Sequence, residues 1–122
     1  MSSIVYIEIP APHFEQTKNF YQEVFGWKVK ESDLDGSPYA MFETLEGDYG
    51  LTGGGFNPNL KSLDRGSLSV FLGTEDIPKA LDKIQKAGGE IIQEKTEIGG
   101  GYGFYAEYKD PSGNILSLWA KS

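Results

Sequence analysis

The sequence of 122 residues contains no cysteine, which excludes disulfides, thiol nucleophiles and thiolate metal ligands. Histidine and arginine occur once each, as His13 and Arg65. With a net charge of −7, a single arginine argues against nucleic-acid binding, because phosphate contacts need Lys and Arg. The chain has no apolar run long enough for a membrane span, and its first ten residues lack the pattern of a secretory signal. We expect a cytoplasmic protein that binds neither nucleic acids nor membranes.

The chain does contain enough apolar sequence for one folded domain over residues 1–122, with 39% hydrophobic and 13% aromatic residues. Its apolar positions follow either the period of two typical of strands or the spacing of a helix. One helical stripe begins at Phe14 and stops at Gly26. The predicted strands are residues 3–9, 27–32, 39–44 and 48–52 in the first half and 68–72, 90–95, 104–109 and 115–120 in the second, where a helix covers 77–87.

The second half of the chain repeats the first. Phe14 and Ile77 occupy equivalent helix positions 63 residues apart. The sequence therefore predicts an α+β fold of two β-α-β-β-β modules, at residues 1–56 and 67–122, joined by a linker at 57–66. A single helix covers one face of each sheet and leaves the other face open. Placed side by side, two such modules form a cup, a curved mixed sheet with the helices outside.

The last predicted strand shows which side chains face this cup. Leu116 and Leu118 point one way and pack on the helices, whereas Ser117 and Trp119 point into the cup. Further side chains are expected there: aromatic walls from Tyr6, Phe42 and Phe71, and a hydroxyl from Ser69. An aromatic lining of this kind suits a flat, apolar small molecule, and the serines could hydrogen-bond it.

Glu8 is the best candidate for acid–base chemistry, because alternation places it on the cup face beside Tyr6. A carboxylate that faces an apolar cup is desolvated, which suits it to proton transfer. Tyr6 could donate a hydrogen bond to a ligand carbonyl. His13 lies where the first helix begins and is expected to be a surface residue. The direction of Glu107 depends on the strand register.

Two glycine clusters, Gly53 to Gly55 and Gly99 to Gly103, could be mistaken for phosphate-binding loops. A phosphate loop needs a strand that runs into a helix N-terminus, and neither cluster precedes a predicted helix. We expect both to be flexible loops at the mouth of the cup, with Tyr102 as a lid residue.

Four stretches together resemble one known family: FYQEVFGWKV, GLTGGGF, TEDIPKALDKIQKAGGEII and YKDPSGNILSLW. The chain is similar over essentially its whole length to the vicinal oxygen chelate superfamily. That superfamily includes glyoxalase I (lactoylglutathione lyase), bleomycin-resistance proteins and extradiol dioxygenases. The nearest resemblance is to its single-domain, lactoylglutathione lyase-related branch. The resemblance implies paired modules with a ligand site inside the cup and, as in many single-domain relatives, a homodimer.

The resemblance also implies where a metal would be held. The usual ligand positions fall on Tyr6, Ser69 and Ser117, with the remaining one near Gly50 or Leu51. None of these is His, Glu or Gln, and hydroxyls alone rarely hold a divalent ion. We therefore expect no metal, no cofactor and no metal-dependent lactoylglutathione lyase activity.

Three classes of function stay open on this basis. The first is a metal-free protein of the glyoxalase/bleomycin-resistance kind that binds a small aromatic or apolar molecule in the cup, and it is the reading we favour. The second is a metal-independent isomerase or lyase that uses Glu8 as its base. The third is a non-catalytic interaction protein in which the aromatic rings fill the cup.

Overall fold

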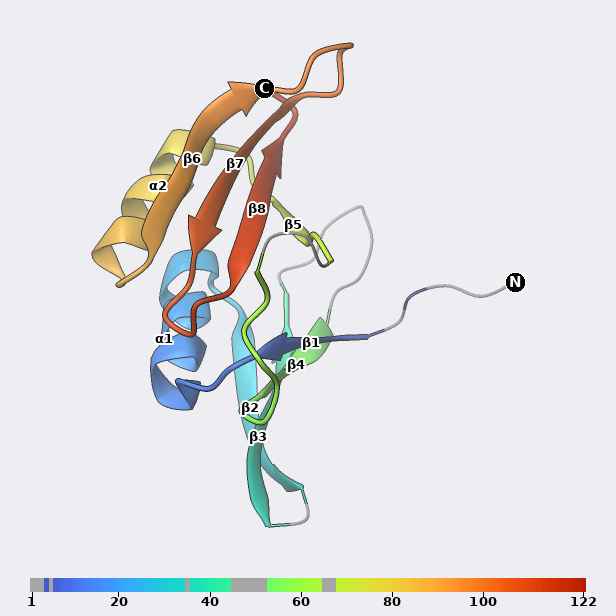
Figure 1. Ribbon diagram of the computed structural model, residues 1–122, viewed down its shortest axis with the longest axis vertical. Coiled ribbons are helices and arrows are strands. Elements are labelled where there is room, and N and C mark those ends of the chain that lie inside the picture. The colour runs from blue at the N-terminus through green and yellow to red at the C-terminus, as the bar shows by residue number, and fades with distance from the viewer. Residues whose placement is uncertain (1–3, 5, 35, 45–52, 65–67) are drawn as a thin grey trace.

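The computed structural model describes residue 4 and residues 6–34, 36–44, 53–64 and 68–122. The predicted strand at 48–52, with Gly50 and Leu51, lies outside the described residues. None of the helices in the described ranges is long and apolar enough to cross a membrane. The elements are β1 (Ile7–Pro10), α1 (Phe14–Phe25), β2 (Lys28–Leu34), β3 (Ser37–Glu43), β4 (Gly53–Asn57), β5 (Phe71–Gly73), α2 (Ile77–Lys86), β6 (Glu90–Glu97), β7 (Phe104–Lys109) and β8 (Ile115–Ala120), as Figure 1 shows.

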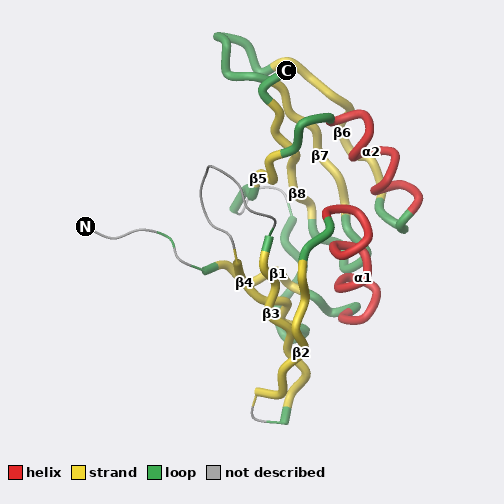
Figure 2. The backbone as a smooth tube through the Cα atoms, turned by 180° about the vertical axis from the view of Figure 1, so that it is seen from behind, coloured by secondary structure: helices red, strands yellow, loops and turns green. Residues whose placement is uncertain are grey.

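Each half of the chain forms its own four-stranded mixed sheet. The strand orders are β1-β4-β3-β2 and β5-β8-β7-β6. In each sheet the first strand runs parallel to the last, and the other pairs are antiparallel. The α+β fold of two β-α-β-β-β modules is thereby confirmed. Both helices lie on one side of the molecule, and α1 contacts α2 (Figures 1 and 2). The face of each sheet that is turned away from the helices is called its open face.

The helix side of the first sheet is aromatic. Tyr21 of α1 stacks on Trp27, with the ring centroids 4.8 Å apart. Phe42 was expected in the cup, and this prediction is wrong: its ring stacks on Trp27 at 4.5 Å and contacts Phe56 at 5.0 Å. Ala40 and Phe56, which pair in register, are fully buried on the same side. Phe42 therefore contributes to the core beneath α1, not to the open face.

Strand β4 contains the first glycine cluster, which corrects the prediction of a loop. Gly54 lies where an added Cβ would come within 2.3 Å of the Ile7 carbonyl and 2.6 Å of the Phe42 ring. The side-chain position of Gly55 points the other way, 2.0 Å from the Tyr39 hydroxyl. The strand therefore needs glycine because large rings cross it on both faces.

The turn at residues 110–114, DPSGN, joins the second module to the first. The Asp110 carboxylate is buried and accepts hydrogen bonds from the backbone N–H groups of Ser112 and Asn114 and from the Tyr21 hydroxyl of α1. The Asn114 amide donates to the carbonyl of Pro10, at the end of β1, at 2.6 Å. This turn therefore connects β7 and β8 to two elements of the first module.

The strand registers extend the repeat to the later strands of each module. Glu8 pairs with Gly55 in the first sheet, as Phe71 pairs with Ser117 in the second. Glu8 and Phe71 are 63 residues apart, whereas Gly55 and Ser117 are 62 apart. Met41, the other neighbour of Gly55, lies 66 residues before Glu107, which is the β7 partner of Ser117. The longer loop before β7 is therefore followed by a shorter connection before β8.

Candidate ligand-binding site

The open face of the first sheet carries a hydrogen-bonded polar cluster. The Tyr39 hydroxyl of β3 donates to Glu8 Oε2 of β1 at 2.8 Å and lies 2.6 Å from the Tyr6 hydroxyl. The Asn57 amide of β4 donates to Glu8 Oε1 at 3.3 Å. We call these four residues the Tyr–Glu cluster. It brings Tyr6 and Glu8 together, as alternation predicted, through a third residue that was not predicted to belong to the site.

Within this cluster, Tyr39 is buried whereas Tyr6 is 44% exposed and Glu8 is exposed. Burial, reinforced by the hydrogen bonds to Tyr6 and Glu8, raises the pKa of Tyr39 well above its ordinary value. Its hydroxyl therefore keeps its hydrogen at any physiological pH. Among the described residues, the exposed Glu8 carboxylate is hydrogen-bonded to Tyr39 and Asn57 and does not face an apolar cup, and its acid–base role stays a prediction.

The open face of the second sheet carries aromatic rings beside polar residues. Phe71 of β5 is 54% exposed and lies opposite Ser117, which is itself buried. Glu107 pairs with Ser117 from the other side, so the register places it on the open face. Trp119 is half-buried two residues farther along β8. Phe71, Ser117 and Trp119 therefore share one face, whereas Ser69 is an exposed residue that precedes β5.

The loop between β6 and β7 contacts Trp119 at the end of this face. The indole N–H of Trp119 donates to the carbonyl of Tyr102 at 2.8 Å, and the Tyr102 side chain is 72% exposed. Gly103, with φ of 94°, lies against the indole, because an added Cβ would come within 3.1 Å of its nitrogen. The second glycine cluster is thus a loop, held against the tryptophan by its backbone.

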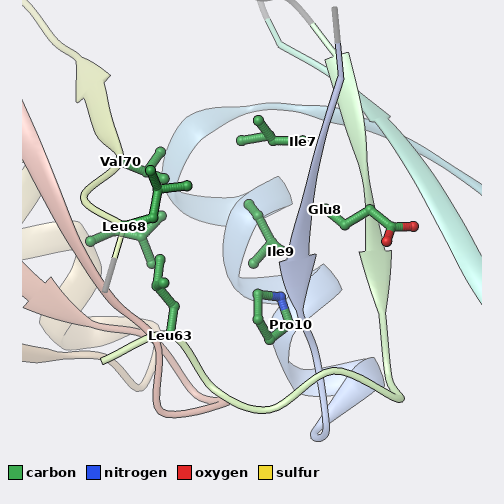
Figure 3. Close-up of a pocket in the computed structure, with 8 residues that line it drawn as sticks. Ile7, Glu8, Ile9, Pro10, Leu63, Leu68 and Val70 are labelled. Carbon is green, nitrogen blue, oxygen red and sulfur yellow. The ribbon is translucent and has the colours of Figure 1, made fainter. Parts of the chain in front are cut away.

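A small cavity separates the two modules where β1 approaches the residues before β5 (Figure 3). Its volume is about 100 Å³. Drug-sized ligands need about 300–1,000 Å³, so this cavity is too small for a flat aromatic molecule. The Glu8 side chain points away from the aliphatic side chains that line it (Figure 3). The lining residues are Ile7, Glu8, Ile9, Pro10, Leu63, Leu68, Val70 and Leu116.

The residues at the expected metal positions do not fit a divalent ion. In the strand registers Gly55 corresponds to Ser117, so Gly55 is the described residue at the fourth position, whereas Gly50 and Leu51 lie outside the described residues. A glycine offers no ligand, and the space above it holds the hydroxyls of Tyr39 and Tyr6, at 2.0 and 2.6 Å from an added Cβ. Among the described residues, no three His, Cys, Asp or Glu side chains gather closely enough to bind a metal.

Three further residues, His13, Tyr39 and Asn57, show what the sequence could and could not predict about this site. His13 is exposed at the start of α1, as expected, and its backbone N–H donates to the Ser112 hydroxyl. Its side chain makes no capping hydrogen bond. Tyr39 and Asn57 were missed. Alternation shows that Tyr39 and Met41 share a face of β3, but it does not show which face that is.

Comparison with known proteins assigns the chain to a family. Residues 3–118 match the model of the Glyoxalase/Bleomycin resistance protein/Dioxygenase superfamily. The chain belongs to this superfamily. Lactoylglutathione lyase GLX1 of Arabidopsis thaliana is 29% identical over 113 residues, which cover 85% of this chain and 39% of that protein. The chain therefore spans well under half the length of this relative.

Solved structures of other proteins share the fold. TnmS3, an antibiotic binding protein from Streptomyces sp. CB03234, superposes with a TM-score of 0.73 at 21% identity, over 100% of this chain and 98% of that one. A glyoxalase I mutant from Zea mays gives a TM-score of 0.69 at 20% identity, over 96% of this chain and 46% of that one. The superfamily fold thus occurs in both a binding protein and an enzyme.

Proposed function

We propose that this superfamily member is a metal-free binding protein for a small aromatic or apolar molecule, which it holds against its open faces. The observation that carries the proposal is the exposure of aromatic rings there. Tyr6, directly before β1, is 44% exposed, and Phe71 of β5 is 54% exposed. The similarity to TnmS3 supports a binding role, because that protein binds an antibiotic on the same fold. The small cavity between the modules is not the proposed site.

We also propose that the protein is a homodimer, in which a second copy encloses the ligand against the open faces. The exposed rings of Tyr6 and Phe71, together with Met41 at 43% exposure, provide apolar area for such a contact. Size-exclusion chromatography with light scattering checks this directly. A protein that stays monomeric at micromolar concentration, with and without ligand, contradicts the dimer.

Binding is tested by thermal unfolding across a panel of aromatic compounds, with wild type compared with Trp119→Ala. We expect at least one compound to raise the unfolding temperature of wild type and to lose most of that effect in the variant, because the indole forms a wall of the site. Val29→Ala, a substitution on the helix side of β2, is the control for general destabilisation. Equal responses from wild type and Trp119→Ala would exclude Trp119 from the site.

We expect purified protein supplied with Ni²⁺ or Zn²⁺ to show no turnover of the methylglyoxal–glutathione adduct. The positions that would hold the metal are occupied by Tyr6, Gly55, Ser69 and Ser117, which offer no strong ligand. Metal-dependent turnover would contradict this part of the proposal.

A further inference from the structure

The hydrogen-bond directions in the Tyr–Glu cluster are fixed by counting hydrogens. The Tyr39 hydroxyl has one hydrogen, and it points to Glu8 Oε2 at 2.8 Å. The 2.6 Å contact between the Tyr6 and Tyr39 hydroxyls must then be donated by Tyr6. In this arrangement the one hydrogen of the Tyr6 hydroxyl is used within the protein, so the predicted donation to a ligand carbonyl would require this bond to break.

What the cluster offers to solvent is consequently a set of acceptors. Tyr6 presents oxygen lone pairs, and the exposed Glu8 carboxylate has acceptor capacity beyond its bonds from Tyr39 and Asn57. The side-chain oxygen of Asn57, Oδ1, already accepts from the backbone N–H of Asn59 at 2.9 Å. One amide N–H of Asn57 is the remaining donor. A ligand carbonyl or carboxylate would meet lone pairs and a negative charge here, whereas an ammonium group would be complementary.

Lys30 is the cation that the strand registers place on this face, at the edge opposite Glu8. In the strand registers, Glu8, Gly55, Met41 and Lys30 form one row across the sheet from β1 to β2. Three strand spacings separate Glu8 from Lys30, which is about 14 Å at 4.8 Å per strand. Among the described residues Glu8 forms no ion pair, and its carboxylate is exposed.

We infer that the ligand of this face carries an ammonium group next to an aromatic ring. This inference rests on the proposed binding function and specifies its ligand class. The Glu8 carboxylate would accept a charge-assisted hydrogen bond from the ammonium, and the half-exposed Tyr6 ring could also contact the cation. The net charge of −7 favours the approach of a cation over that of an anion.

The test uses three indoles that share a ring and differ in charge: tryptamine, 3-propylindole and indole-3-propionate. Their binding to the full-length wild-type protein is measured by calorimetry at low and high salt. We expect tryptamine to bind about tenfold more tightly than 3-propylindole, a difference of about 1.4 kcal/mol, and indole-3-propionate to bind more weakly than both. The preference for tryptamine should shrink as salt is raised.

Glu8→Gln removes the charge but keeps an oxygen that can accept from Tyr39. It should lower the affinity for tryptamine about tenfold and leave 3-propylindole unchanged. Glu23→Gln, an equal charge change on the exposed surface of α1, is the matched control and should alter neither. If Glu8→Gln does not fold, the salt dependence of wild-type binding answers the same question.

The outcomes distinguish the ammonium inference from the proposed binding function. Equal affinity for all three indoles, or loss of tryptamine binding in Glu23→Gln to the same extent as in Glu8→Gln, overturns the ammonium inference and leaves the binding function intact. Failure of every indole and every compound of the aromatic panel to bind overturns both.

Discussion

The two modules share one strand order but place their aromatic residues differently. In the first, the rings of Tyr21, Trp27, Phe42 and Phe56 pack together under α1, and the open face carries the polar Tyr–Glu cluster. In the second, the helix side is largely aliphatic, with Ile77, Ile84, Leu116 and Leu118 fully or nearly fully buried, while Phe71 and Trp119 lie on the open face. The same backbone plan therefore gives one open face with a hydrogen-bonded polar cluster and one with aromatic rings.

The largest expected loss of stability comes from weakening the 110–114 turn, which connects the two modules. Asp110→Asn removes an acceptor from the 110–114 turn and points an amide at the Tyr21 hydroxyl and the Asn114 amide, which are both donors. We expect the free energy of unfolding to fall by about 3 kcal/mol, because buried donors lose their partner. Urea unfolding measures this. Asp82→Asn, exposed on α2, is the control and should cost less than about 0.5 kcal/mol.

Asp110 also makes the stability of the protein depend on pH. Burial raises the pKa of Asp110, even though hydrogen bonds from Asn114, Tyr21 and Ser112 act in the opposite direction. The folded protein therefore holds a proton at pH values where the unfolded chain has released it. The contribution of Asp110 to stability is full below the ordinary pKa of Asp. It decreases as pH rises through the raised pKa that Asp110 has in the folded protein. The stability difference between wild type and Asp110→Asn should accordingly narrow on going from acid to neutral pH; a difference that widens would contradict the raised pKa.

A smaller effect distinguishes the open faces. Gly55→Ala on the first face would place a methyl group 2.0 Å from the Tyr39 hydroxyl, whereas Gly73→Ala in β5 of the second sheet meets nothing within 4 Å. We expect Gly55→Ala to cost about 1–3 kcal/mol through overpacking and Gly73→Ala to cost less than about 0.5 kcal/mol. Thermal unfolding of the two variants side by side measures the contrast. Equal costs would show that the tyrosine hydroxyls move away without penalty.

The smallest predicted effect concerns the polar cluster itself. Tyr39→Phe removes both hydrogen bonds of the buried hydroxyl and should lower the free energy of unfolding by about 1 kcal/mol. Tyr102→Phe, which deletes a hydroxyl from a side chain that is 72% exposed, should be nearly neutral. Chemical denaturation of both variants tests the difference. A neutral Tyr39→Phe would mean that the cluster contributes nothing to stability.

Much of the fold could be predicted from the sequence. The spacing of the apolar residues and the repetition of the first half of the chain in the second half independently support the same helices and strands. The alternation in β8 correctly assigned Leu116 and Leu118 to the core and Trp119 to the open face. The spacing of 63 residues between Phe14 and Ile77 identified two equivalent modules, and both residues begin helices. Local patterns were sufficient wherever one face of an element is clearly apolar.

The site was harder to predict because its features depend on cross-strand neighbours. In β3, Tyr39, Ala40, Met41 and Phe42 are all apolar or amphipathic, so alternation could not show which parity faces the core, and Phe42 was assigned to the wrong side. The run of glycines at the start of β4 was interpreted as a loop because glycine disfavours strands. Only the rings packed above and below Gly54 and Gly55 explain why a strand can form there.

The 110–114 turn has a consequence for how the chain could be divided. Its contacts run from the last hairpin to β1, through the Asn114 bond to Pro10, and to α1, through the Asp110 bond to Tyr21. These contacts do not require an unbroken chain between the modules. A cut between Asn59 and Leu60, both exposed, would leave two fragments that each carry one side of this junction. We expect the fragments to reassociate in trans when mixed, which would make the protein a candidate for split-reporter designs.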